Sequence, residues 1–235
     1  MLFQFNHIVS PLNTASGAVA MLLIALLGGI STPNAQAQTV QSADTKVQFH
    51  RARTAFESGN SLLEAKARID RVLKEDPEDV EALKLRSSIL MGLGRKEDAI
   101  DDAIFATRLA PKDGEAQLLL CETAYANENM PLASEALKNA TDVMAKQVNW
   151  LVRLSVCALS LGDTHRAESL ARTAVAANDL EPKAHIQLAR IFARSGRNQD
   201  AISVLNKMVS NALVSEKAIL QDAEFAAIYA PAKNR

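Results

Sequence analysis

Few side chains of this 235-residue chain have the types and spacing that catalysis or metal binding requires. The four histidines, His7, His50, His165 and His185, lie far apart, and no two are spaced as metal ligands. The sequence has no HExxH, CxxC, P-loop, GxGxxG or GxSxG motif, which mark common metalloenzyme, redox, nucleotide and hydrolase sites. We therefore expect no catalytic residue, no metal, no cofactor and no small-molecule substrate.

The two cysteines, Cys121 and Cys157, are separated by 36 residues. The interpretation we favour is that both are small buried apolar side chains. The alternative is a disulfide, which requires an oxidising compartment and Cα atoms within about 7 Å of each other. The spacing leaves the pairing open.

The elements that carry these side chains follow a repeat of fixed length. Five alanines stand 34 residues apart without interruption: Ala65, Ala99, Ala133, Ala167 and Ala201. A period between about 20 and 50 residues is typical of a solenoid, in which one structural unit is stacked on the next. We divide the repeat into five units: 46–79, 80–113, 114–147, 148–181 and 182–215.

Each unit has the pattern of two helices joined by a turn. Apolar residues recur three or four positions apart, as expected for helices that bury one face. Position 15 is occupied by glycine in the second, fourth and fifth units, as Gly94, Gly162 and Gly196. Glycine adopts the backbone conformation that ends the first helix at little cost. A small alanine at position 20 lets two helix axes approach closely.

These units resemble tetratricopeptide repeats, whose pattern is W-x2-L-G-x2-Y…A-x3-F…P. The tryptophan column is replaced throughout, and Ala145 and Asp179 stand where the third and fourth units should have proline. The resemblance implies an all-α fold, a right-handed α-solenoid of about five helix–turn–helix repeats. The matches in the second unit are Leu83, Leu90, Gly94, Ala99, Ala103, Ala106, Leu109 and Pro111.

The last segment, residues 216–235, is predicted to be a capping helix and a short tail. Ser215 is a plausible N-cap, and a cap is needed because a solenoid must cover its final apolar face. The apolar series expected to face the last repeat is Ile219, Leu220, Ala223, Ala226, Ala227 and Ile228.

The first 37 residues have the features of a secretory signal. An apolar run is followed by a helix-breaking segment and an Ala-x-Ala site, which predicts cleavage between Ala37 and Gln38 and a linker over 38–45. The segment has no lysine or arginine, so an uncleaved membrane anchor and a cytoplasmic protein remain alternatives. We expect a periplasmic or secreted protein, with tethering to the inner membrane if the leader is retained.

The resemblance also implies where a partner binds. In this family the first helices line a concave groove, and positions 2, 5, 9, 12 and 13 of a unit face it. Lys84 matches the lysine of the family's clamp for acidic peptide termini, but no unit has its asparagine at position 9. We therefore do not expect that clamp. The groove residues predicted for this chain are Lys84, Ser88, Met91, Leu118, Glu122, Tyr125, Val152, Val156, Leu159, Ile186, Arg190 and Arg194.

The groove is expected to be apolar in its later units and charged at its ends. A partner segment would dock on five apolar side chains: Leu118, Tyr125, Val152, Leu159 and Ile186. The substitutions Val152→Asp and Leu159→Asp should therefore abolish capture of the partner. Arg190 and Arg194 would form a positive end, and Glu115 and Glu122 a negative region.

The function expected from these features is a non-catalytic scaffold that binds a protein or peptide partner in the cell envelope. The resemblance favours a role in assembling a pilus, a secretion system or the cell wall. A self-associating structural protein and an accessory subunit of an envelope enzyme are the alternatives. A formal net charge of −1 with both signs interspersed gives no electrostatic basis for binding nucleic acid.

Overall fold

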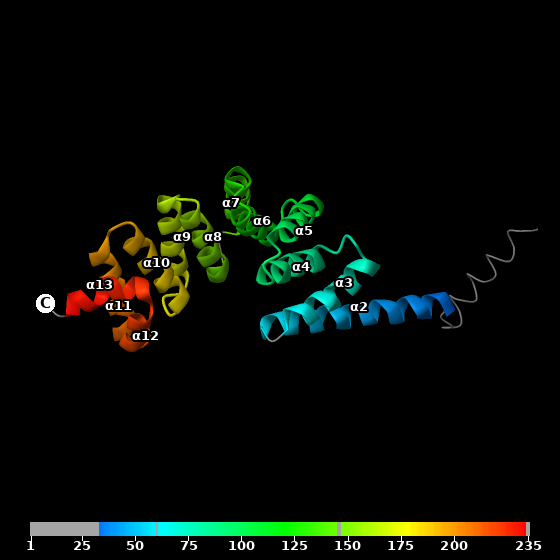
Figure 1. Ribbon diagram of the computed structural model, residues 1–235, viewed down its shortest axis with the longest axis horizontal. Helices are drawn as coiled ribbons and strands as arrows, with labels where there is room; N and C mark the ends of the chain where they lie inside the picture. Colours follow the sequence, from blue (N-terminus) through cyan, green and yellow to red (C-terminus); the bar gives the residue numbers. More distant parts are fainter. Residues whose placement is uncertain (1–32, 60, 145–146, 234–235) are drawn as a thin grey trace, which may run out of the picture. The chain divides into compact units, whose positions relative to one another are not determined.

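The computed structural model describes residues 33–59, 61–144 and 147–233. These residues form helices joined by short turns, and no strand occurs among them (Figure 1). In chain order the helices are α2 (Pro33–Glu57), α3 (Leu62–Glu75), α4 (Val80–Gly92), α5 (Lys96–Leu109), α6 (Gly114–Ala126), α7 (Met130–Met144), α8 (Val148–Ser160), α9 (Thr164–Ala177), α10 (Pro182–Arg194), α11 (Asn198–Ser210), α12 (Glu216–Gln221) and α13 (Ala223–Lys233).

The chain divides into two compact units, residues 1–47 and residues 48–235. Residues 1–32 of the predicted leader lie outside the described residues, whereas the backbone at Ala37 and Gln38 is helical within α2. None of the helices in the described ranges is long and apolar enough to cross a bilayer.

Within the second unit, successive helix pairs pack in chain order. The pairs are α4 with α5, α6 with α7, α8 with α9, and α10 with α11. The first helices of the pairs also contact one another in sequence, α4 with α6, α6 with α8, and α8 with α10. Each pair therefore buries its apolar face on the next one, as a solenoid requires. The predicted all-α solenoid is confirmed.

The alanine column lies in the core between the helices. Ala65, Ala99, Ala133, Ala167 and Ala201 are all fully buried, and each lies in the second helix of its pair. A side chain larger than a methyl group at these positions would force the helix axes apart, because interiors are close-packed. The 34-residue period is thus a packing constraint as well as a sequence pattern.

Position 15 requires a left-handed backbone at the end of the first helix. Gly94, Gly162 and Gly196 have φ values of 75°, 80° and 73°. Glu128 holds the same position in the third unit with φ of 60°. A residue with a Cβ costs about 1 kcal/mol there relative to glycine. The turn is therefore kept even where the sequence departs from the preferred residue.

A second column, at position 34, caps the first helix of the following unit. The side chains of Asp79, Asp113, Glu181 and Ser215 each accept a hydrogen bond from a backbone amide in the first turn of α4, α6, α10 and α12, respectively. Such a cap satisfies an amide that has no partner within the helix. The last residue of these units therefore also fixes where the following helix begins.

The capping segment contains two helices instead of the single helix expected. Asp222 is extended, and its Oδ1 accepts hydrogen bonds from the amides of Glu224 and Phe225, so a new helix begins at Ala223. This restart changes which residues face the last repeat. Ile219, Phe225 and Tyr229 are buried, whereas Leu220, Ala223 and Ala227 from the predicted series are exposed.

Candidate partner-binding groove

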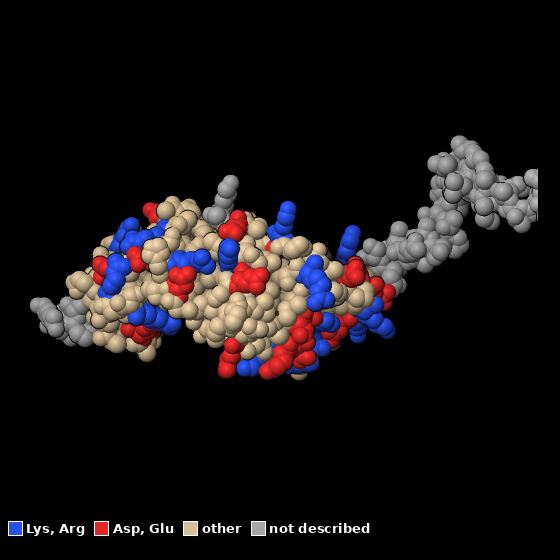
Figure 2. All heavy atoms as spheres, turned by 90° about the horizontal axis from the view of Figure 1, so that it is seen from above, with Lys and Arg blue, Asp and Glu red and all other residues tan. Residues whose placement is uncertain are grey.

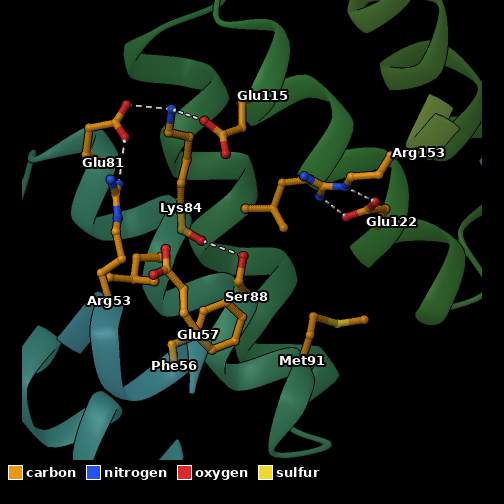
Figure 3. Close-up of a pocket in the computed structure, with 12 residues that line it drawn as sticks. Arg53, Phe56, Glu57, Glu81, Lys84, Ser88, Met91, Glu115, Glu122 and Arg153 are labelled. Atoms are coloured by element: carbon orange, nitrogen blue, oxygen red, sulfur yellow. Dashed lines mark hydrogen bonds and ion pairs between the residues drawn. The ribbon is translucent and has the colours of Figure 1, made fainter. Parts of the chain in front are cut away.

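The first helices of the repeats line a cavity of about 720 Å³. Its walls come from the end of α2 and from α4, α6 and α8 (Figure 3). Among the predicted groove residues, the cavity brings together Lys84, Ser88, Met91 and Glu122. The remaining lining residues are Arg53, Phe56, Glu57, Glu81, Leu85, Glu115, Leu119 and Arg153.

Lys84 is buried in the cavity wall, and its ammonium is surrounded by carboxylates. The Nζ atom lies 2.8 Å from Asp113 Oδ2, 3.0 Å from Glu115 Oε2 and 2.5 Å from Glu81 Oε1. Burial disfavours the charged ammonium, but the hydrogen bonds to these carboxylates outweigh it and raise the pKa of Lys84. Burial alone would also raise the pKa of Asp113, but the contact with Lys84 lowers it. Both groups are therefore charged at neutral pH.

The other two basic residues of the cavity also contact carboxylates. Arg153 on α8 donates to both oxygens of Glu122 on α6, at 2.9 and 2.6 Å. Arg53 on α2 lies 3.6 Å from Glu81 on α4. These pairs connect successive first helices, because each joins residues from neighbouring units. The bidentate arginine–carboxylate geometry makes the Arg153–Glu122 pair the more directional of the two.

Leu118 does not belong to the groove surface, contrary to the prediction. Its side chain is fully buried in the core cluster that also contains Leu137 of α7 and Leu151 of α8. Lys84, at the same position of the preceding unit, is likewise buried. In the third unit, position 5 therefore lies between successive helices, where an apolar side chain such as Leu118 gains most from the core.

Of the other predicted apolar groove residues, two are open to solvent. The exposed fractions are 39% for Tyr125 on α6 and 45% for Val156 on α8. Val152 and Leu159 are half-buried and pack against the core cluster, and Ile186 packs in the same way against the C-terminal cluster. The accessible apolar surface is therefore narrower than expected.

The predicted positive end is neutralised by the capping segment. Arg190 donates to Asp222 at 2.9 Å and to Glu224 at 3.1 Å, and Arg194 donates to Glu224 at 2.8 Å. Hydrogen bonding to Glu224 outweighs burial and raises the pKa of Arg194. These arginines hold α13 against α10 because the cap supplies carboxylates opposite them. A partner does not meet an unpaired positive patch at this end.

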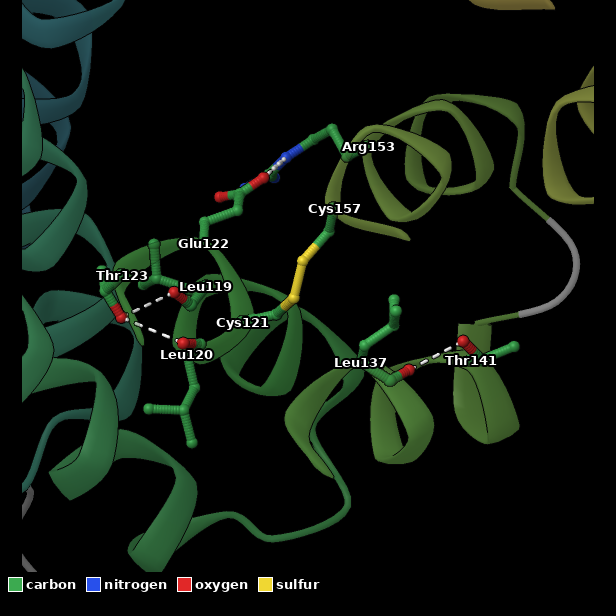
Figure 4. Close-up of a disulfide and its surroundings, with 9 residues drawn as sticks. All are labelled: Leu119, Leu120, Cys121, Glu122, Thr123, Leu137, Thr141, Arg153 and Cys157. Carbon is green, nitrogen blue, oxygen red and sulfur yellow. Dashed lines mark hydrogen bonds and ion pairs between the residues drawn. A yellow bond between two sulfur atoms is a disulfide. The ribbon is translucent and has the colours of Figure 1, made fainter. Parts of the chain in front are cut away.

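Cys121 and Cys157 form a disulfide between α6 and α8, the first helices of neighbouring units (Figure 4). Their Cα atoms are 6.8 Å apart, and both side chains are buried in the core cluster. The interpretation favoured from the sequence, two separate packing residues, is therefore wrong. The Glu122–Arg153 ion pair lies next to the disulfide, so a covalent bond and an ionic contact join the same two helices.

Several cavity residues were not predicted from the sequence. Glu81 stands at position 2, which the family pattern places in the groove, so the signal was present. Glu115 holds the same position in the next unit and was expected in the negative region of the groove. Leu85, Leu119 and Arg153 stand at position 6, which that pattern does not include. The charge of the position-6 residue Arg153 beside Glu122 was an additional indication, because opposite charges on adjacent helices attract.

The electrostatic surface is mixed. On the face shown in Figure 2, lysines and arginines are interspersed with aspartates and glutamates over most of the surface. In the described part of the chain, no group of three or more histidine, cysteine, aspartate or glutamate side chains could hold a metal ion.

Comparison with solved structures shows the same fold in proteins of low sequence identity. A thermophilic tetratricopeptide repeat protein of Thermus thermophilus is 21% identical, with a TM-score of 0.63 over 81% of this chain and 100% of the other. YrrB, described as a tetratricopeptide repeat protein with an unusual peptide-binding site, is 18% identical, with a TM-score of 0.55 over 87% and 99%. MamA of Desulfovibrio magneticus, from its residue 41 onward, is 16% identical, with a TM-score of 0.58 over 74% and 97%.

No curated protein matches the sequence of this chain. The sequence profile of the tetratricopeptide repeat family matches residues 49–104 and 156–213. These two stretches cover helices near both ends of the solenoid, and the fold places the intervening units in the same contact pattern. The chain is therefore a member of the tetratricopeptide repeat family.

Proposed function

We propose that this protein is a non-catalytic scaffold of the bacterial cell envelope, which holds a segment of a partner protein along its first helices. Tetratricopeptide repeat proteins generally mediate contacts between proteins. The observation that carries the proposal is the cavity lined by the end of α2 and by α4, α6 and α8, together with the exposed apolar side chains of Tyr125 and Val156. A concave surface with exposed apolar groups is suited to an extended or helical peptide.

The likeness to YrrB supports docking of a peptide, because that protein is described as having a peptide-binding site. Tyr125 and Val156 lie on α6 and α8, which contact each other. An aromatic side chain on such a surface is a suitable anchor, because it buries a large area at low cost in conformational entropy.

The envelope location is supported by the leader and by the disulfide. Residues 1–37 carry the pattern of a secretory signal, and buried disulfides persist in oxidising compartments such as the periplasm. An exported scaffold of this family would serve the assembly of an envelope machine such as a pilus, a secretion system or the cell-wall apparatus.

A charge placed at Val156 tests the docking surface. A photoreactive amino acid at position 156 first identifies the partner by cross-linking in intact cells. We expect Val156→Asp to weaken binding of the identified partner at least about tenfold, because the substitution would bury a charge without a counterion. We choose Val156 over Val152 and Leu159, whose packing against the core would confound the result.

Val143 on α7 provides the matched control. It is 54% exposed and lies on a second helix of the repeat, not on a first helix as Val156 does, so Val143→Asp introduces the same charge away from the docking surface. Binding measured by isothermal titration calorimetry should be unchanged by this control. Equal affinities for the Val156→Asp variant and the unmodified protein would refute docking at this surface.

The export step has its own test. Amino-terminal sequencing of the protein isolated from its native cells should give a chain that begins at Gln38, because the Ala-x-Ala site ends at Ala37. A periplasmic protein that begins at Met1 would show that the leader is retained as an anchor. A cytoplasmic protein that begins at Met1 would overturn the envelope proposal.

A further inference from the structure

Carboxylates outnumber basic groups around the cavity. Glu57, Glu81, Glu115 and Glu122 line it, against Arg53, Lys84 and Arg153. Asp113 adds a further carboxylate through its contact with Lys84. The site therefore carries excess negative charge in a partly enclosed space, where charges are screened less than on an open surface.

Each basic group of the cavity already has an acidic partner. Lys84 has three carboxylates around its ammonium, and Arg153 binds both oxygens of Glu122. Arg53 lies opposite Glu81. An acidic ligand would have to displace one of these contacts and would meet the remaining carboxylates. The lysine of the family's clamp is present in this chain, but its charge is satisfied internally.

Glu57, unlike the basic groups of the cavity, has no partner of opposite charge among the described residues. It is the last residue of α2, it is exposed, and it makes no ion pair or side-chain hydrogen bond with any described residue. The carboxylates of Glu81 and Glu115, whose side chains are 54% and 40% exposed, are shared with Lys84 and remain accessible from the cavity. A cation entering the cavity would therefore find an unpaired carboxylate and two partly exposed ones.

The apolar part of the wall suits the stem of a basic side chain. Phe56, Leu85, Met91 and Leu119 lie among the charged groups, and Figure 3 shows Phe56 beside Glu57. Lysine and arginine have an apolar stem and a charged tip, so they can contact both kinds of surface. The ring of Phe56 can also stabilise a cation placed over its face.

We propose that this cavity receives a lysine or arginine side chain of the docked partner segment. The inference rests on the proposed function, because it assumes that a protein segment lies along the first helices. It adds the chemistry of that segment: a basic residue flanked by apolar residues. The preference is the reverse of the family's clamp for acidic termini, and it follows from the carboxylates around Lys84.

The test uses an addressed array of random dodecapeptides, acetylated and amidated, probed with the labelled full-length protein. We expect the bound peptides to be enriched in lysine and arginine next to apolar residues. Glu57→Lys should reduce binding of these peptides about tenfold, since it replaces an attraction with a repulsion. Circular dichroism checks that the helical content is unchanged.

Glu75→Lys is the matched control. Glu75 is also exposed, also the last residue of its helix, and has no ion pair or side-chain hydrogen bond with a described residue. This variant should bind the same peptides as the unmodified protein to within a factor of about two. An equal loss in both variants would mean that net charge, not the cavity, governs binding, and would overturn the proposal.

The remaining outcomes separate this inference from the proposed function. Binding of apolar peptides that is independent of their charge and is lost in Val156→Asp would overturn the basic-residue preference alone. Enrichment of acidic peptides would do the same. If neither Glu57→Lys nor Val156→Asp weakens binding, both proposals would be overturned. Sedimentation that depends on protein concentration and is lost in Glu57→Lys would identify a second copy as the occupant and would overturn the partner assignment.

Discussion

Reduction of the Cys121–Cys157 disulfide is expected to lower the free energy of unfolding by about 4 kcal/mol. The two residues are 36 apart, and the bond closes the corresponding loop in the unfolded chain. Opening that loop increases the conformational entropy of the unfolded state, which destabilises the fold. Because both cysteines are buried, the bond should resist reductant until the helices separate.

Guanidinium unfolding followed by circular dichroism, with and without dithiothreitol, measures this effect. The double variant Cys121→Ala/Cys157→Ala is the control, and its unfolding midpoint should not respond to the reductant. A thiol assay on the unfolded samples verifies the redox state. Identical midpoints for the oxidised and fully reduced protein would show that the bond contributes nothing to stability.

Leu118→Ala is expected to cost about 2–5 kcal/mol of stability, because it leaves a cavity in the core cluster between α6, α7 and α8. Val156→Ala, on the exposed surface of α8, should cost at most about 0.5 kcal/mol. The two substitutions distinguish a core residue from a groove residue, although the sequence assigns both to the groove. Chemical unfolding of both variants provides the measurement.

A small loss for Leu118→Ala, similar to that for Val156→Ala, would place Leu118 at the surface and restore the assignment made from the family pattern. A large loss for both would mean that Val156 is also part of the core. In that case Val156→Asp would be unsuitable as a test of docking.

The period of the repeat made the helices predictable. Position 20 must be small and position 15 must tolerate a left-handed backbone, so Ala133 and Gly162 carry information about the fold even without their neighbours. These constraints act within one unit and recur in each. A single sequence can reveal them because its five units can be compared with one another.

The groove was less predictable, because it depends on how the units are rotated against one another. Lys84 reaches Glu115 from the next unit, and Arg153 reaches Glu122 from the preceding one. No pattern within one unit determines these contacts. The family's groove positions assume an average geometry, and Leu118 departs from it because its side chain is enclosed in the core cluster with residues of α7 and α8.

The sequence predicted a helical capping segment, but it did not predict that this segment is divided into two helices. An apolar series after Ser215 indicated a helix, but the side chain of Asp222 competes for the backbone amides that follow it. The restart rotates Phe225 and Tyr229 toward the last pair, where Tyr229 donates a hydrogen bond to Asn206 at 2.8 Å.

The pairing of Arg190 and Arg194 with Asp222 and Glu224 also limits the length of the array. A solenoid that ended in an uncovered helix pair would expose an apolar face, and another copy of the protein could stack on it. Here α12 and α13 cover that face, and the ion pairs hold them in place. Assembly into filaments through this face would first require the two helices to detach.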